Sequence, residues 1–291
     1  MNYSFEFIDT VKEFKDFKLG PLKFGLEPGS VMAYIGPNGS GKTTSLYLLS
    51  GHQQAKSGTI EIFGQQNSLD KIDWKYKIGF VSDEPSFFSN WDAVKNLKFI
   101  SGFYPKWSNK RTDELINRLS MPTNKKVKDL SKGNLTKLSI IAALSHNPQL
   151  LILDEPTDGL DPVIRTEFFD LLYEYMEDEE NSIIYSTHAL NEINRLSDKL
   201  AFLNNGQIKM ISDTESLIEK WRIIEIKGII SDGNNLNFIS ENLYNNGISI
   251  LKVSDYITAM KYLMEKEIKI INEKYMSIEE ISISIIKEDY R

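Results

Sequence analysis

The sequence predicts an α/β fold with a mixed, largely parallel sheet, and three observations support this. Across residues 1–211, short apolar segments typical of buried strands alternate with segments of helical spacing, as in strands joined by crossover helices. The β-like segment 30–35 leads into a glycine-rich turn and then into a helical pattern. The apolar segment 150–153 ends abruptly in two acidic residues, as a buried strand does where it reaches the edge of a parallel sheet.

The individual elements of this first unit are expected as follows. Strands are predicted at 59–63, 78–81 and 182–186 besides the two segments above, and 199–203 pairs with 207–211 in a hairpin turning at Asn205-Gly206. Helices are predicted from the glycine-rich turn to Gly51, at 163–176 and at 189–196. Residues 82–144 are mostly helical, with breaks at Pro85, Pro105 and Pro122. We expect a helical subdomain at about 83–145.

Beyond Trp221 the pattern changes, and a small second α/β unit is expected. Residues 223–230, 248–253 and 268–271 are β-like, whereas 236–244, 257–266 and 278–286 are predicted to be helical. The chain is therefore divided into a cassette at 1–220 and a small C-terminal unit at 221–291.

Composition excludes several classes of protein. The 291 residues include 41 acidic and 34 basic side chains, giving a net charge of −7, and no cysteine. The negative charge disfavours a nucleic-acid partner, and the lack of cysteine excludes disulfides and thiolate metal sites. We find neither a signal-peptide pattern at the start nor a run of 18 apolar residues. A soluble, cytoplasmic protein is expected.

The glycine-rich turn fits the pattern G-x-x-x-x-G-K-[ST]. In such a loop glycines let backbone N–H groups surround phosphate oxygens, the lysine binds the β- and γ-phosphates, and the threonine hydroxyl binds Mg²⁺. The alternative is a chance match in a glycine-containing turn, but the strand before it and the helix after it favour nucleotide binding. The predicted phosphate-binding residues are Gly36, Pro37, Asn38, Gly39, Ser40, Gly41, Lys42, Thr43 and Thr44.

Two carboxylates follow the apolar strand at 150–153. Ligands of α/β sheets bind at the carboxyl ends of strands, so Asp154 is suited to hold Mg²⁺ and Glu155 to act as general base towards water. The alternative is a strand end with two solvated acids. His188 follows the strand at 182–186 and is suited to sense a γ-phosphate, although a lone histidine is more often structural.

Together these motifs resemble the nucleotide-binding subunit of an ABC transporter over residues 1–211. Gly36 to Thr43 is similar to the Walker A motif, and 150–155 to Walker B with its catalytic glutamate. His188 is similar to the switch histidine, Leu160-Asp161 to the D-loop and 130–134 to the signature. The resemblance implies ATP and Mg²⁺ as cofactors and a dimer in which Ser131 and Gly133 bind the partner's nucleotide. Phe14, with Phe17 as the alternative, is similar to the aromatic residue that stacks on adenine.

The sequence departs from the family pattern in two motifs. In the signature, Lys132 stands in place of one of the two glycines and Asn134 in place of the final glutamine. In 78–85, which resembles the Q-loop, Asp83 replaces the glutamine. A carboxylate there can still bind Mg²⁺ but repels the γ-phosphate. Because Lys42, Ser131, Glu155 and His188 are all present, we expect a competent but slow ATPase, with Asp83 as a metal ligand and catalytic residue.

The resemblance also implies partners. Residues 83–107 are rich in aromatic side chains and match the family's groove for a helix of the membrane subunit, although some of these side chains can simply be core. The C-terminal unit and the motifs around Asp83 and Lys132 resemble ABC-2-type exporters of antimicrobial peptides, including phenol-soluble modulins. We therefore expect a peripheral exporter subunit on the cytoplasmic face of the membrane. The alternatives are a soluble ABC ATPase acting on ribosomes or DNA and, with less support, a P-loop GTPase or kinase.

Overall fold

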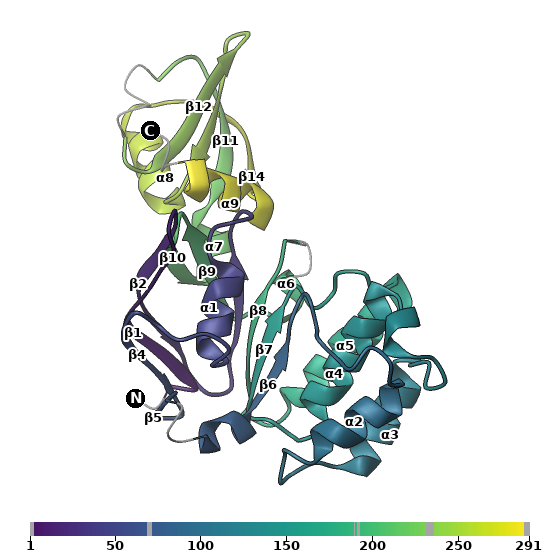
Figure 1. Cartoon of the computed structure of the whole chain (residues 1–291). Helices are drawn as coiled ribbons and strands as arrows, with labels where there is room; N and C mark the ends of the chain where they lie inside the picture. Colours follow the sequence, from purple (N-terminus) through teal and green to yellow (C-terminus); the bar gives the residue numbers. More distant parts are fainter. Residues whose placement is uncertain (1–2, 69–71, 189, 191–192, 231–235, 288–291) are drawn as a thin grey trace.

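The computed structural model describes residues 3–68, 72–188, 190, 193–230 and 236–287, which form three sheets with helices around them (Figure 1). The central sheet has six strands in the order β10-β9-β3-β8-β7-β6. These are β3 (Val31–Ile35), β6 (Ile78–Val81), β7 (Leu150–Asp154), β8 (Ser182–Ser186), β9 (Lys199–Asn204) and β10 (Gln207–Asp213). All neighbours are parallel except β9 and β10, so the predicted fold class is confirmed.

The hairpin between β9 and β10 turns where the sequence places it. Asn205 has φ 46° and Gly206 φ 75°, the left-handed conformation that a tight hairpin turn requires. Every residue of β3, β7 and β8 is buried, as expected for strands covered on both faces.

A second, antiparallel sheet of the cassette was not expected from the sequence. It has the order β2-β1-β4-β5, with β1 (Phe5–Glu13), β2 (Lys18–Leu26), β4 (Ser57–Ile62) and β5 (Gln65–Gln66). Its buried side chains share one core with helix α1 (Lys42–Leu49) and one face of the central sheet. The side chains of β1 alternate only partly between buried and exposed, which weakens the period-two pattern of a strand.

The helical subdomain lies beside the β6 edge of the central sheet (Figure 1). It contains α2 (Ala93–Ser101), α3 (Asn109–Arg118), the short 3₁₀ turn η2 (Val127–Asp129) and α4 (Lys132–Leu144). Another 3₁₀ turn, η1 (Asp73–Lys77), precedes β6 outside this subdomain. Helix α5 (Pro162–Tyr175) follows β7, and α6 (Ile193–Leu196) follows β8. Of the helix predicted at 189–196, residues 189, 191 and 192 lie outside the described residues.

The C-terminal unit contains an antiparallel sheet of order β12-β13-β11-β14. Its strands are β11 (Arg222–Lys227), β12 (Ile239–Asn245), β13 (Ile248–Val253) and β14 (Ile270–Tyr275), and α8 (Tyr256–Glu265) lies between β13 and β14 in the chain. The helix predicted at 236–244 is wrong, because this segment is strand β12. Asn246 (φ 49°) and Gly247 (φ 85°) form the turn to β13, the same turn chemistry as in the β9–β10 hairpin.

The chain enters this unit through α7 (Thr214–Lys220) and returns from it through α9 (Ile278–Lys287). Helix α9 contacts β9 and β10 (Figure 1), and its side chains Ile278, Ile281 and Ile285 belong to the same buried cluster as the central sheet. The sheet β11–β14 and α8 have a separate core. The division of the chain at residue 220 stays a prediction. None of the described helices is long and apolar enough to cross a membrane.

Candidate nucleotide-binding site

The glycine-rich turn joins the central strand β3 to α1 and is shaped by its own backbone. Lys42 Nζ donates hydrogen bonds to the carbonyl oxygens of Gly36 at 2.7 Å and Pro37 at 3.3 Å. A Cβ atom on Gly36 would lie 2.2 Å from the carbonyl oxygen of Leu203, so only glycine fits there. Ser40 is 3% exposed, and its Oγ has no hydrogen-bond partner among the described residues. The loop is therefore a closed turn with polar groups left over for a ligand.

Lys42 is the cation of this turn. Its side chain is 7% exposed, and burial lowers its pKa, whereas the nearby carboxylates of Glu155 and Asp154 raise it. The carbonyl oxygens that it now contacts are neutral acceptors. A buried ammonium with incomplete charge compensation favours an anionic ligand.

Asp154 ends β7 at the carboxyl edge of the sheet and is 1% exposed. Burial raises its pKa, and hydrogen bonding from Ser186 lowers it; the Ser186 hydroxyl donates to Oδ1 at 2.6 Å. Oδ2 is buried and has no hydrogen-bond partner in the part of the chain that the structure describes. A buried carboxylate oxygen without a partner, near the Thr43 hydroxyl, fits the oxygen ligands that Mg²⁺ requires.

Glu155 and His188 lie in direct contact. Glu155 Oε2 is 2.8 Å from His188 Nδ1 and accepts the backbone N–H of His188 at 3.2 Å. Glu155 N–H in turn donates to Ser186 Oγ at 3.0 Å, and Glu155 itself has φ 48°. Burial raises the pKa of Glu155, while His188 and Lys42 lower it. The structure thus brings together Lys42, Asp154, Glu155 and His188 from three different segments.

Residues of the signature-like segment lie at the start of α4. Ser131 caps this helix by accepting the N–H of Asn134 at 3.3 Å. A Cβ atom on Gly133 would lie 2.2 Å from the carbonyl oxygen of Gly159, so this segment packs tightly against the loop that follows Glu155. The described contacts of Ser131 and Gly133 are with their own helix and this loop rather than with the phosphate-binding turn.

Asp83 lies in the loop after β6, and its carboxylate pairs with a lysine. Lys132 Nζ is 2.7 Å from Asp83 Oδ1 and also 2.7 Å from Asp158 Oδ2. Among the described residues no group of three or more histidine, aspartate or glutamate side chains is arranged to hold a metal ion. Asp83 lies near Asp154 and adds to the rise of its pKa, which is due mainly to burial. In this structure, however, Asp83 Oδ1 bonds to Lys132 and, among the described residues, not to a candidate site residue.

The remaining candidate residues are the aromatic pair Phe14 and Phe17, Asp161 and the other residues of the glycine-rich turn. Phe14 is 47% exposed, 6.4 Å from the ring of Phe17. Phe17 lies closer to the loop, since a Cβ atom on Gly41 would lie 3.1 Å from its ring. Asp161 caps α5 by accepting the N–H groups of Val163 and Ile164. Pro37, Asn38, Gly39 and Thr43 are exposed and Thr44 is half-buried.

The sequence did not point to Ser186 or Asp158, although each contacts a predicted site residue. Ser186 ends β8 and links Asp154 to Glu155. The sequence does carry a signal for Ser186, because a polar residue at the end of a buried strand needs a polar partner.

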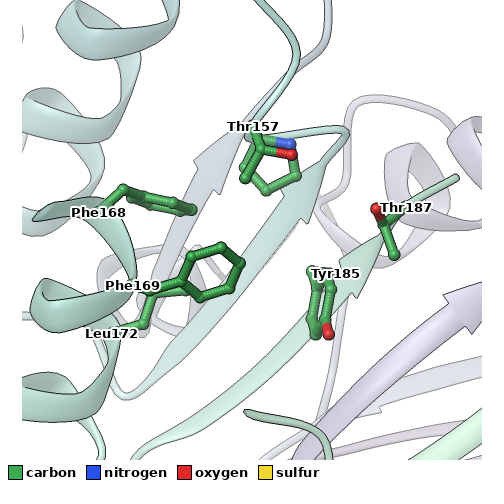
Figure 2. A pocket seen from close by; sticks show the side chains of 7 residues that line it. Thr157, Phe168, Phe169, Leu172, Tyr185 and Thr187 are labelled. Atoms are coloured by element: carbon green, nitrogen blue, oxygen red, sulfur yellow. The ribbon is translucent and has the colours of Figure 1, made fainter. Parts of the chain in front are cut away.

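A small cavity lies next to these strand ends. Thr157, Tyr185 and Thr187 face Phe168, Phe169 and Leu172 of α5 around its volume of about 10 Å³ (Figure 2). This is roughly the space of one water molecule, so the site rests on a closely packed base.

A groove of about 720 Å³ lies between the central sheet with α1 and the helical subdomain. Tyr47, His52 and Phe80 line it on the side of the sheet. On the other side Tyr104 stacks on His146 with ring centroids 3.9 Å apart, and burial lowers the pKa of His146 to about 4. Next to it, Phe88, Phe99 and Phe103 are 44–61% exposed. The segment 83–107 thus contributes aromatic side chains both to the groove and to an exposed surface.

Comparison with known proteins places these features in a family. The family model described as "ABC transporter" matches residues 19–158. YdbJ of Bacillus subtilis, described as an uncharacterized ABC transporter ATP-binding protein, is 33% identical over 78% of this chain and 74% of its own length. The bacitracin transport ATP-binding protein BcrA of Bacillus licheniformis is 35% identical over 64% of this chain and 62% of its own length. The lantibiotic transport ATP-binding protein SrtF of Streptococcus pyogenes is 34% identical over 65% of this chain and 82% of its own length.

Solved structures share the fold at lower identity. An ATP-binding subunit of an ABC transporter superposes with a TM-score of 0.68 at 23% identity, covering 74% of this chain and 92% of the other. A dimeric ATP-binding cassette in a post-hydrolysis state with ADP and Pi superposes with a TM-score of 0.63 at 23% identity, covering 72% of this chain and 98% of the other.

Proposed function

Because this chain belongs to the ATP-binding subunits of ABC transporters, we propose that it powers the export of a peptide or drug-like substrate through a separate membrane subunit. The family assignment makes the chain an ATP-binding protein and an ATPase. Two relatives are named for the transport of bacitracin and of a lantibiotic, which are antimicrobial peptides. The single observation that carries the proposal is the aromatic groove that α1 and β6 form with the helical subdomain.

We assign the chemistry to the residues that converge on the carboxyl edge of the sheet. When ATP binds, Lys42 leaves its backbone carbonyl partners and bonds to phosphate oxygens. The backbone of the loop residues 36–44 and the N-terminus of α1 bind the same phosphates. Glu155, oriented by His188 at 2.8 Å, accepts the proton of the attacking water. When bound, Mg²⁺ would neutralise phosphate charge, held by the Thr43 hydroxyl, Asp154 Oδ2 and, as the sequence predicts, Asp83.

We further propose that two such subunits pair head to tail. In that arrangement Ser131 and the N–H of Gly133, at the positive end of α4, face the nucleotide of the partner. Phe14, or Phe17 next to the loop, stacks on adenine, and Asp161 contacts the partner while capping α5. The dimeric state of a related solved cassette supports this arrangement.

The membrane partner docks, on this proposal, at the segment 83–107 beside the groove. Exposed aromatic side chains next to a groove are typical anchors for a short helix, and Lys95 lies 4.5 Å above the ring of Trp91, so the surface offers apolar and cationic contacts together. On this proposal the chain is a peripheral subunit at the cytoplasmic face of the membrane. Within exporters, amphipathic peptides such as phenol-soluble modulins are the proposed cargo.

Purification of the tagged chain from detergent-solubilised membranes tests this function. A multi-spanning membrane protein, identified by mass spectrometry, is expected to copurify, and Trp91→Ala should release it while ATP binding is retained. Tyr244→Ala is the matched control, because Tyr244 is an exposed aromatic on β12, in the C-terminal unit. Copurification of ribosomes instead would favour a soluble ABC ATPase. Unchanged association of the Trp91 variant would reject the docking surface.

A further inference from the structure

The two departures from the family pattern meet in space. Lys132 and Asp83 are 49 residues apart in the sequence, yet Lys132 Nζ lies 2.7 Å from Asp83 Oδ1. The same ammonium bonds to Asp158 Oδ2 at 2.7 Å. One cation therefore joins the loop after β6, the start of α4 and the loop after β7.

The backbone brings Lys132 to this position. Lys132 is the first residue of α4, whose cap is Ser131. The next residue, Gly133, packs against Gly159 so closely that a Cβ atom would lie 2.2 Å from the Gly159 oxygen. Because the start of α4 cannot shift away without losing this contact, the lysine side chain remains within reach of both carboxylates.

Both carboxylates lie near candidate catalytic residues. The pKa of Asp154 is raised mainly by burial, and Asp83 adds to this rise, while the backbone N–H of Asp158 donates to the carbonyl oxygen of Glu155 at 3.1 Å. Hydrogen bonding to Lys132 is the largest cause that lowers the pKa of Asp158. All three side chains are 38–48% exposed, and solvent-exposed ion pairs contribute little to folding stability.

We infer that Lys132 is a positioning residue for ATP hydrolysis: it holds Asp83 and Asp158 and neutralises their charge at the rim of the nucleotide site. The inference rests on the proposed function, in which Asp154, Glu155 and His188 act on bound ATP. A carboxylate at the Q-loop position repels the γ-phosphate, and a lysine at the signature position of the same chain offsets that repulsion. The two unusual residues are thus a matched pair, and each alone is expected to be harmful.

A double-mutant cycle tests the pairing of Lys132 with Asp83. It compares the wild type, the two single variants and the double variant, each purified as the intact complex. Lys132→Met should lower kcat/KM for ATP about tenfold, because the uncompensated Asp83 carboxylate repels the γ-phosphate. The same change should lower the Mg²⁺ concentration needed for half-maximal rate, because the freed carboxylate attracts the cation. Lys132→Met combined with Asp83→Asn should recover most of that loss. Lys132→Arg, which keeps the charge, should stay within about threefold of the wild type. Lys128→Met, the same charge change at an exposed position in η2, should have no effect.

Two results would overturn the inference. If Asp83→Asn gives no recovery, so that the two losses simply multiply, Lys132 acts directly on the partner's nucleotide and not through Asp83. If Lys132→Met equals the wild type in kcat, KM and Mg²⁺ dependence, the pair has no positioning role. The same cycle is also measured as the affinity for a fluorescent ATP analogue with and without Mg²⁺. This binding readout tests the pair even if the proposed coupling to transport, or hydrolysis itself, fails.

Discussion

Among the residues that the structure describes, two ion-paired contacts join the helical subdomain to the rest of the cassette, and they differ in their surroundings. Arg118, at the end of α3, binds Glu167 and Glu174 of α5 at 2.5–2.8 Å, with a two-pronged contact to Glu174. Lys132, at the start of α4, binds Asp83 and Asp158 at 2.7 Å. Each contact places one cation between two carboxylates. The arginine joins two regular helices, whereas the lysine joins two loops that border the nucleotide site.

The comparison teaches that similar ion pairs can serve different purposes. The planar guanidinium fixes the relative orientation of two helices, and hydrogen bonding to Arg118 is the largest cause that lowers the pKa of Glu174. The flexible lysine instead controls the charge near reacting groups. We expect the first contact to affect stability and the second to affect turnover, and the following changes test this division in order of decreasing effect.

The largest effect is expected at the reacting end. Glu155→Gln removes the proposed base, so kcat should fall about 10²–10⁴-fold, while ATP binding persists because Lys42 and the phosphate-binding turn are untouched. Single-turnover hydrolysis and ATP binding are measured on the same preparation. Hydrolysis within twofold of the wild type would reject Glu155 as the base.

The next effect concerns the close contact between Gly133, at the start of α4, and Gly159. In Gly133→Ala the added Cβ atom meets the Gly159 carbonyl, which lies 2.2 Å away, so α4 or the loop after Glu155 must move. We expect roughly tenfold lower ATPase activity and a loss of about 1–3 kcal/mol in the free energy of unfolding. Gly102→Ala is the control, because the nearest atom to its Cβ would be 3.4 Å away. Unchanged activity would show that the Gly133–Gly159 contact is not needed to hold the start of α4, and with it Lys132, in position.

The pH dependence gives a smaller effect at the same end. Burial raises the pKa of Glu155, and the proposed base must be ionised, so activity should be lost as the pH falls through a value above the ordinary 4.5. His188 lowers the pKa of Glu155, so His188→Ala should move this acid limb to higher pH. The profile of kcat against pH measures both. An acid limb at or below the ordinary glutamate value would contradict the environment described here.

The smallest catalytic effect is expected at the arginine contact. Arg118→Met should lower the free energy of unfolding by about 1 kcal/mol, because these side chains are partly exposed and solvent screens them. The ATPase rate and Mg²⁺ dependence should stay within twofold of the wild type. Chemical denaturation and steady-state kinetics are compared with the Lys132 variants. If Arg118→Met changes Mg²⁺ dependence as Lys132→Met does, the two contacts do not differ in purpose.

The sequence was most informative where chemistry restricts residue type over a short span. The phosphate-binding turn and the Asp154-Glu155 strand end could be found because glycine, lysine and carboxylates must occur there at fixed spacing. The contact between Asp83 and Lys132 could not, because no local rule relates residues that far apart. The error at β12 has a different cause. Asn246-Gly247 carries the same hairpin signal as Asn205-Gly206, but the apolar residues before it have helical spacing and conflict with that signal.

The return of α9 to the central core gives the C-terminal unit two points of attachment. Trp221 and Leu217 on the way out, and Met276, Ile278 and Ile281 on the way back, lie in one apolar cluster with the cassette. The sheet β11–β14 is therefore connected to the cassette at both of its ends, and each connecting segment is packed into the cassette's core. Shortening the chain at Lys220 would remove side chains from the interior of the ATPase and leave an open apolar patch against β9 and β10.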